Sequence, residues 1–214
     1  MSLLGGRGNA FIVSCILFVF GVAYSFAQHS EGPPSVAPSV SDVPAIAPDC
    51  SEGWRITGYY TPIESDFKGT DAREIEILGV GKESFNTEFL RTIFDDDKGY
   101  GEGWGKTRFG WYLGNYAGRW HKADAPLDAN DHPLEPNTVA VDNSVIPVGS
   151  SVNIPELPGD LGKLKFVSND VGVSVHGKHI DVYTGEGVEA RRRMYRFTYE
   201  DEDKGLQRVC FSSH

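Results

Sequence analysis

The chain has 214 residues, 40% of them hydrophobic and 23% charged, with 25 glycines and 12 prolines. This length is enough for one ordinary domain with extensions at its ends. A formal net charge of −10 excludes the basic surface that nucleic-acid binding requires, so nucleic acid is not an expected partner.

The first 27 residues have the pattern of a secretory signal peptide. Arg7 is followed by an apolar run at 10–26 and by a small-x-small sequence that ends at Ala27. This order predicts cleavage after Ala27 and a location in the periplasm or cell envelope, or outside the cell. An uncleaved anchor is the alternative, since the run is just long enough to span a bilayer, and only then is the membrane a partner.

Residues 28–49 are rich in Pro, Ser and Ala and hold almost no large apolar side chains. Such a segment buries too little surface to fold, so it predicts a flexible linker before a globular domain at 50–214. After cleavage two cysteines remain, Cys50 and Cys210, near the two ends of this domain. Because neither lies inside a periodic apolar run, we expect a disulfide in an oxidising compartment; two buried free thiols are the alternative.

Short apolar stretches bounded by Gly, Pro and Asn dominate the domain and favour β-strands. The expected strands are 54–60, 137–142, 150–157, 161–170 and 179–185. An amphipathic helix is predicted over 81–95 and a second, short helix over 188–195. Many short strands with few short helices predict a mainly β fold built as a small β-barrel.

The segment 97–120, inside an insertion at 63–136, places seven aromatic residues among seven glycines. Aromatic rings in a Gly-rich, poorly periodic stretch stack on the apolar faces of sugars and can line a groove. The alternative is that they cover one end of the barrel, and a few can do both. Trp104 and Trp111 are the candidates for sugar contact.

Three aspartates, Asp142, Asp170 and Asp181, stand beside predicted strands and close to Gly or Pro. Buried carboxylates cost free energy unless they are paired or used in function, so structure alone does not account for them. Their motifs are Val-Asp at 141–142 with Ile-Pro-Val-Gly at 146–149, Asp-Val-Gly at 170–172, and Gly-Lys-His-Ile-Asp-Val-Tyr at 177–183.

The spacing of these motifs resembles the three-aspartate (3D) domain of the membrane-bound lytic murein transglycosylase A family. Thr-Gly-Tyr-Tyr-Thr-Pro at 57–62 is similar to that family's first strand, so the resemblance covers 137–197 and 54–62. It implies a six-stranded double-psi β-barrel with the aspartates at one mouth. It also implies cleavage of the β-1,4 bond between MurNAc and GlcNAc in peptidoglycan glycan strands, without water or a cofactor, to leave a 1,6-anhydro sugar.

Asp181 is then the expected acid/base, and Asp170 and Asp142 are the carboxylates that tune and orient it. Because the sugar's own C6 hydroxyl attacks, one carboxyl group serves first as acid and then as base. Such a group needs a raised pKa, which close like charges provide. The residues expected to orient the sugar are Thr57, Tyr59, Lys178, His179 and Tyr183.

The chain departs from this family at two places. Val-Ser-Val-His-Gly at 173–177 replaces the usual Gly-Ala-Ile-Lys-Gly, so that Lys178 stands one position late and a glycine that permits close backbone approach is lost. The segment 63–136 is also short for the family's large second domain. Both departures bear on substrate affinity and specificity more than on the barrel.

Two other classes of protein stay open. A non-catalytic, expansin-like module that binds cell-wall polysaccharide is the main alternative, because a double-psi barrel does not by itself fix function. A toxin or effector that acts on a competitor's wall would have the same site residues. A metal site at His176, His179 and Asp181 is not expected, since in an extended strand 179 and 181 share a face while 176 points away.

Overall fold

The computed structural model describes residues 49–199, 201 and 204–213. The predicted signal peptide lies outside these residues, as does the predicted linker except for Asp49, which is the first residue of a strand. Within the described part of the chain, no helix is long and apolar enough to cross a membrane.

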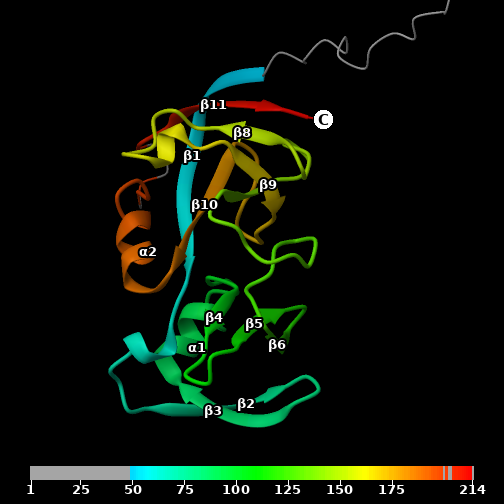
Figure 1. The fold of residues 1–214 in the computed structure, drawn as a ribbon, viewed down its shortest axis with the longest axis vertical. Coiled ribbons are helices and arrows are strands. Elements are labelled where there is room, and N and C mark those ends of the chain that lie inside the picture. The colour runs from blue at the N-terminus through cyan, green and yellow to red at the C-terminus, as the bar shows by residue number, and fades with distance from the viewer. Residues whose placement is uncertain (1–48, 200, 202–203, 214) are drawn as a thin grey trace, which may run out of the picture. The chain divides into compact units, whose positions relative to one another are not determined.

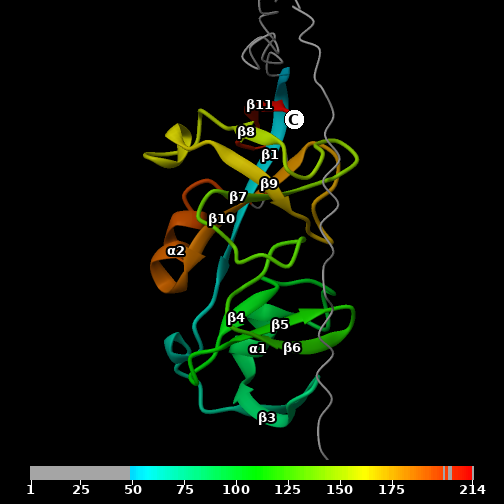
Figure 2. The same cartoon turned by 45° about the vertical axis from the view of Figure 1, so that its right-hand side comes forward.

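Six strands close into a barrel in the order β1-β10-β7-β9-β8-β11 (Figure 1 and, with all six labelled, Figure 2). Their bounds are β1 Asp49–Thr61, β7 Thr138–Val141, β8 Ser151–Asn153, β9 Phe166–Asp170, β10 His179–Glu186 and β11 Gln207–Ser212. The pairs β1/β10 and β7/β9 are parallel, and the other four are antiparallel. The expected mainly β fold with a six-stranded barrel is therefore confirmed.

Alternation along the strands decides which side chains fill the barrel. In β10, Ile180 and Val182 are fully buried in the core, together with Ile56 of β1 and Val139 and Val141 of β7. Because side chains alternate between the two faces of a strand, the residues between them point away from that core. This outward face carries the candidate site.

Two of the predicted strands are shorter than expected. The stretch 150–157 forms strand only at β8, and 161–170 forms a 3-10 helix, η3 (Leu161–Lys163), before β9 begins. Prolines at 155 and 158 lie between them. Because proline has no backbone N–H to donate to a sheet, the chain leaves the barrel there as a loop.

The predicted insertion forms a second sheet in the order β3-β2-β6-β5-β4 (Figure 1). Its strands are β2 Ala72–Ile77, β3 Gly81–Asn86, β4 Trp104–Lys106, β5 Tyr112–Tyr116 and β6 Arg119–Ala123. The helix α1 (Thr87–Ile93) packs on it through Phe89, Leu90 and Ile93, which are fully buried. The sheet therefore has its own hydrophobic core.

The helix predicted over 81–95 is wrong for its first six residues, which form β3 instead. Residues 81–86 pair along their whole length with β2. The side chain of Asn86 then accepts hydrogen bonds from the backbone N–H groups of Glu88 and Phe89 and caps α1, so the helix begins at Thr87. Tertiary pairing thus overrides the helical spacing of the apolar residues.

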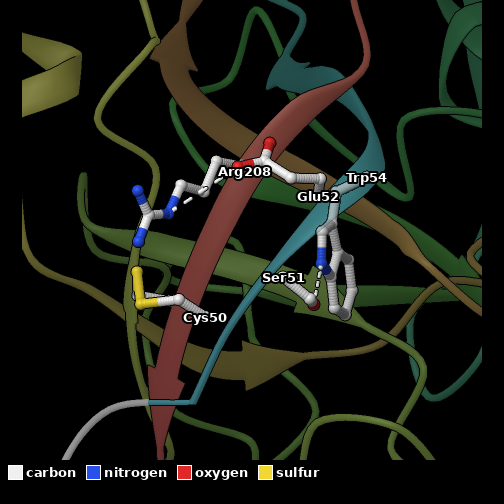
Figure 3. Close-up of a disulfide and its surroundings, with 6 residues drawn as sticks. Cys50, Ser51, Glu52, Trp54 and Arg208 are labelled. Atoms are coloured by element: carbon white, nitrogen blue, oxygen red, sulfur yellow. Dashed lines mark hydrogen bonds and ion pairs between the residues drawn. A yellow bond between two sulfur atoms is a disulfide. The ribbon is translucent and has the colours of Figure 1, made fainter.

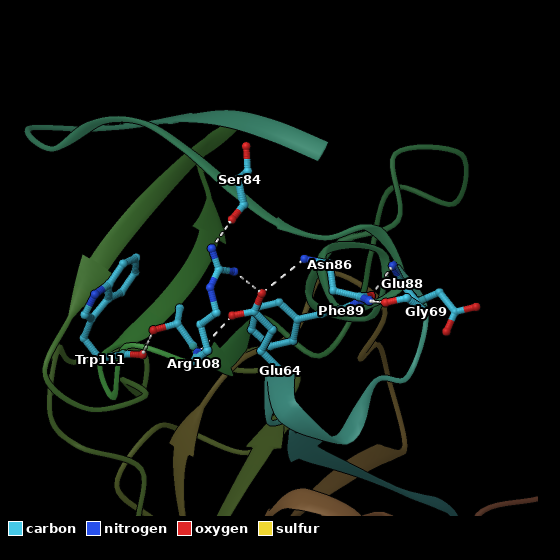
Figure 4. Close-up of polar contacts among 9 residues, drawn as sticks. Glu64, Gly69, Ser84, Asn86, Glu88, Phe89, Arg108 and Trp111 are labelled. Atoms are coloured by element: carbon cyan, nitrogen blue, oxygen red, sulfur yellow. Dashed lines mark hydrogen bonds and ion pairs between the residues drawn. The ribbon is translucent and has the colours of Figure 1, made fainter. Parts of the chain in front are cut away.

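A buried glutamate fixes this junction from the other side (Figure 4). Glu64, in the 3-10 helix η2 (Glu64–Asp66), accepts hydrogen bonds from the backbone N–H groups of Asn86 and Arg108. The guanidinium of Arg108 pairs with the same carboxylate and donates to the carbonyl of Ser84 at 2.8 Å. Because a buried carboxylate requires several donors, this network ties η2, β3 and the loop at residue 108 together.

The predicted short helix is present as α2 (Gly187–Met194), which packs against β1 and β10 (Figure 1). At Gly58, β1 lies so close to the end of α2 and to Phe197 that only glycine fits. A Cβ atom on Gly58 would lie 2.9 Å from side-chain atoms of both Met194 and Phe197.

The disulfide expected between Cys50 and Cys210 is present (Figure 3). The two residues are directly opposite each other in the antiparallel pair β1/β11. Nearby, the indole N–H of Trp54 donates to Ser51 at 2.9 Å. A disulfide that joins the ends of a domain is typical of a protein in an oxidising compartment outside the cytosol.

Candidate active site

One row of residues crosses four neighbouring strands of the barrel. Thr57 of β1 is opposite Asp181 of β10, Asp181 is opposite Ala140 of β7, and Ala140 is opposite Asp170 of β9. Residues in register on adjacent strands share a face, so these side chains project from the same surface. The small side chain of Ala140 leaves space between the two carboxyl groups, whose strands are about 10 Å apart.

This surface forms one wall of a cavity of about 520 Å³. Tyr59, Ala140, Asp170 and Asp181 line it from the barrel. The opposite wall comes from the second sheet and its loops, with Tyr100, Glu102, Trp104 and Tyr116. Asp128, Asp131 and Leu134 of the connection back to the barrel also line it. The predicted insertion therefore contributes directly to the site.

Asp181 is half-buried, and its carboxylate accepts a hydrogen bond from the Thr57 hydroxyl at 2.8 Å. Burial raises the pKa of Asp181 to about 7. The hydrogen bond from Thr57 opposes this shift, the negative charge of Asp170 adds to it, and the positive charge of Arg55 opposes it. A carboxyl group with this pKa can both give up and take up a proton near neutral pH.

Asp170 is held by two donors. The phenol of Tyr59 donates to one of its oxygens at 2.7 Å, and the backbone N–H of Val171 donates to the other at 2.9 Å. Burial raises the pKa of Asp170, while these hydrogen bonds lower it and the charge of Asp128 raises it further. Asp170 is therefore a carboxyl group that hydrogen bonds hold in place in the same cavity as Asp181.

The third aspartate, Asp142, lies outside the cavity lining. Its carboxylate accepts hydrogen bonds from the hydroxyl and backbone N–H of Ser144 and from the backbone N–H of Gly177 at 2.8 Å. Together with a smaller effect of His176, these hydrogen bonds lower the pKa of Asp142 to about 2. Asp142 thus joins the loop after β7 to the loop before β10.

The other predicted residues divide between the cavity and its surroundings. Trp104 lines the cavity and its ring lies 5.9 Å from that of Tyr116. Tyr183 is buried behind Tyr59, with ring centroids 5.2 Å apart. Thr57 and His179 lie behind Asp181 rather than in the lining.

Two predicted residues lie away from the cavity. Lys178 donates to the carbonyl of Glu52 at the disulfide end of β1. Trp111 packs against the core of the second sheet and stacks on Phe109. Among the described residues, no group of three or more His, Cys, Asp and Glu side chains is arranged to hold a metal ion.

Glu102 is a site residue that the sequence analysis missed. Its carboxylate faces the cavity and accepts the backbone N–H of Tyr60 at 2.9 Å. Burial raises the pKa of Glu102 to about 8, with the hydrogen bond from Tyr60 opposing this and the charge of Asp181 adding to it. The preceding Gly101 permits this placement, because a Cβ atom there would lie 2.4 Å from the carbonyl oxygen of Ile93.

Known proteins resemble this chain in domain and fold. The sequence pattern of the 3D domain matches residues 137–196, which hold all three aspartates. The structure resembles E. coli MltA with bound chitohexaose, with a TM-score of 0.54 and 17% identity, over 76% of this chain and 72% of that one. Membrane-bound lytic murein transglycosylase from Agrobacterium tumefaciens is also similar in fold, with a TM-score of 0.47 and 12% identity, over 77% of this chain and 75% of that one.

No curated protein matches the chain. The resemblance read from the sequence motifs is nevertheless confirmed at two levels. Residues 137–196 are a 3D domain, and the fold is similar to that of the lytic transglycosylase MltA.

Proposed function

We propose that this protein is a peptidoglycan lytic transglycosylase. It would cleave the β-1,4 bond between MurNAc and GlcNAc and leave a 1,6-anhydro ring on MurNAc. The observation that carries the proposal is Asp181, a carboxyl group with a pKa raised to about 7 that faces a cavity between the barrel and the second sheet. A similar fold in MltA, a lytic transglycosylase crystallised with chitohexaose, supports it.

In the proposed reaction, protonated Asp181 donates its proton to the glycosidic oxygen, and the bond from C1 to that oxygen breaks. The C6 hydroxyl oxygen of the same sugar forms a bond to C1, and its proton passes to the Asp181 carboxylate. The acid is therefore regenerated without water, and no second carboxylate is needed as a nucleophile. A pKa near 7 suits both half-reactions, because neither protonation state is costly at neutral pH.

Asp170 has an electrostatic role in this scheme. Its negative charge disfavours ionisation of Asp181 and stabilises positive charge as it develops at C1. The hydrogen bond from Tyr59 fixes the Asp170 carboxylate in place. Asp142 acts indirectly, because it holds the loop that leads into β10 and therefore supports the position of Asp181.

The opposite wall of the cavity would hold the glycan. Trp104 and Tyr116 offer neighbouring aromatic rings on which sugar faces stack. Glu102, with its pKa near 8, is mainly protonated at neutral pH and can donate a hydrogen bond to a sugar hydroxyl. Peptidoglycan strands are the proposed partner, and the disulfide fits the proposed location in the periplasm or cell envelope.

Digestion of purified peptidoglycan, followed by mass spectrometry, tests the proposal against Asp181→Asn. The unmutated protein should release 1,6-anhydro-muropeptides, whereas Asp181→Asn should bind the glycan and release none. Binding by both proteins without any product would overturn the proposal in favour of the expansin-like binding module. The altered loop at 173–177 is the feature that favours that second reading.

A further inference from the structure

Three hydrogen bonds in series lead from the loop before β10 to Asp181. The Nδ1 atom of His179 lies 3.2 Å from the carbonyl oxygen of Ser174, and its Nε2 atom lies 2.7 Å from the Thr57 hydroxyl. The same hydroxyl lies 2.8 Å from Oδ1 of Asp181. His179 is buried, with 8% of its surface exposed, and it stands two residues before Asp181 on the same face of β10.

The number of protons in this series is constrained. A carbonyl oxygen only accepts, so the contact with Ser174 requires a proton on Nδ1 of His179. The Thr57 hydroxyl has one proton but lies against both Nε2 and a carboxylate oxygen. If His179 is neutral and Asp181 is ionised, both of these neighbours are acceptors, and one buried contact stays unsatisfied.

One additional proton completes the series in either of two ways. With that proton on Nε2, the imidazolium donates to Thr57 and Thr57 donates to the Asp181 carboxylate. With the proton on Asp181, the carboxyl group donates to Thr57 and Thr57 donates to Nε2. Both arrangements satisfy all three hydrogen bonds and differ only in where the proton resides, so the two residues titrate as a pair.

We propose that His179 and Asp181 share one proton through the hydroxyl of Thr57, and that His179 is thereby a positioning residue for the acid. His179 does not line the cavity, so it acts on Asp181 rather than on a bound sugar. The proton sharing is a property of the folded protein. Its role in supplying the acid form of Asp181 rests on the proposed transglycosylase function.

The charged and titratable groups that face Asp181 are compatible with one retained proton. The negative charge of Asp170 of β9 disfavours ionisation of Asp181. On the opposite wall, the charge of Asp181 in turn helps to raise the pKa of Glu102, so that Glu102 is neutral in the same pH range. Arg55 of β1 favours ionisation of Asp181. The phenol of Tyr59 is engaged by Asp170, and its pKa is raised far enough by burial that it carries no charge at neutral pH.

Two substitutions at Thr57 test the sharing directly. Thr57→Val removes the hydroxyl but keeps the shape of the side chain, whereas Thr57→Ser keeps the hydroxyl. We would follow the imidazole of His179 and the carboxyl carbon of Asp181 by NMR across a pH titration of the full chain. In the unmutated protein and in Thr57→Ser, both nuclei should report the same apparent pKa values.

In Thr57→Val the two groups should titrate separately, with the Asp181 transition moved by about one pH unit, the order expected for one buried hydrogen bond. Identical titration curves in Thr57→Val and the unmutated protein would overturn the sharing. This readout does not depend on activity. Absence of lytic products with a coupled titration would therefore contradict the proposed function and leave the proton sharing intact.

A third substitution tests the consequence for the acid. His179→Gln is expected to present an amide N–H to Thr57, so the ionised Asp181 is fully hydrogen-bonded without an extra proton. The alkaline limb of the pH profile for kcat/KM should then move to lower pH by about one unit, while the rate at low pH is retained. An equal loss at every pH would indicate that His179 only supports the local fold, and would overturn its role as a positioning residue.

Discussion

Replacement of Asp181 by asparagine should stabilise the folded protein at neutral and alkaline pH. Burial raises the pKa of Asp181 from 3.8 to about 7, so the folded protein binds a proton more tightly than the unfolded chain does. The stabilisation by this proton is fully present below pH 3.8 and is lost as the pH rises through 7. Asparagine is neutral at every pH and avoids that loss.

The magnitude follows from the shift in pKa. The pKa of Asp181 differs by about 3 between the folded and the unfolded chain, which corresponds to about 4 kcal/mol. This is an upper value for the gain in the free energy of unfolding that Asp181→Asn should show above pH 7. Urea denaturation of both proteins at about pH 5 and about pH 8.5 measures the part of this gain that develops between these two pH values, about 3 kcal/mol. From the lower to the higher pH, the free energy of unfolding of Asp181→Asn should rise relative to that of the unmutated protein.

Asp142→Asn is the matched control, because this substitution should change the free energy of unfolding at neutral pH in the opposite direction. Hydrogen bonds from Ser144 and Gly177 lower the pKa of Asp142 to about 2. Its stabilising effect is therefore present above pH 3.8 and is lost as the pH falls through about 2, so Asp142→Asn should be less stable at neutral pH. If Asp181→Asn showed the same pH dependence as the unmutated protein, the assignment of a buried, proton-binding Asp181 would be refuted.

Three further substitutions test the remaining parts of the account. Glu102→Gln and the unmutated protein should bind peptidoglycan glycan strands with equal affinity at about pH 6. Above pH 8, calorimetry should show a decline in affinity for the unmutated protein only, because Glu102 then loses the proton that it donates; a parallel decline in both proteins would contradict a role for this proton. Removal of the disulfide by Cys50→Ser with Cys210→Ser should lower the free energy of unfolding by about 2–5 kcal/mol, and reductant should then have no further effect on Tm. Gly58→Ala should cost about 1–3 kcal/mol because its Cβ would overlap α2, whereas Gly69→Ala, with its nearest contact at 3.6 Å, should cost much less in the same urea titration.

The barrel could be predicted because its strands carry strong local patterns. The stretches at 54–60, 137–142 and 179–185 contain alternating or consecutive apolar residues and are bounded by turn residues. All three form strands of the barrel. Asp170 and Asp181 could be placed together because the resemblance of their motifs to the 3D domain implies that the aspartates gather at one mouth of the barrel. The position of Asp142 outside the cavity depends on hydrogen bonds to Ser144 and a distant Gly177, which no spacing in the sequence encodes.

The second sheet was harder to predict. Its strands at 104–106 and 112–116 are short and interrupted by glycine, so they show little periodicity. Residues 81–86 hold a single apolar side chain, Phe85, which is also the first residue of the helical spacing that continues through α1, although 81–86 pairs as a strand. Glu102 has no motif around it. Its burial and its raised pKa arise because the loop carrying it packs against β1, which is a tertiary effect.

The most direct test of the central proposal is digestion of peptidoglycan in water labelled with oxygen-18. If Asp181 directs the C6 hydroxyl to C1, the released muropeptides should carry 1,6-anhydro ends and no label, and Asp181→Asn should release neither kind of product. Reducing ends that carry the label would mean that water attacks C1, and would contradict a transglycosylase mechanism at this site.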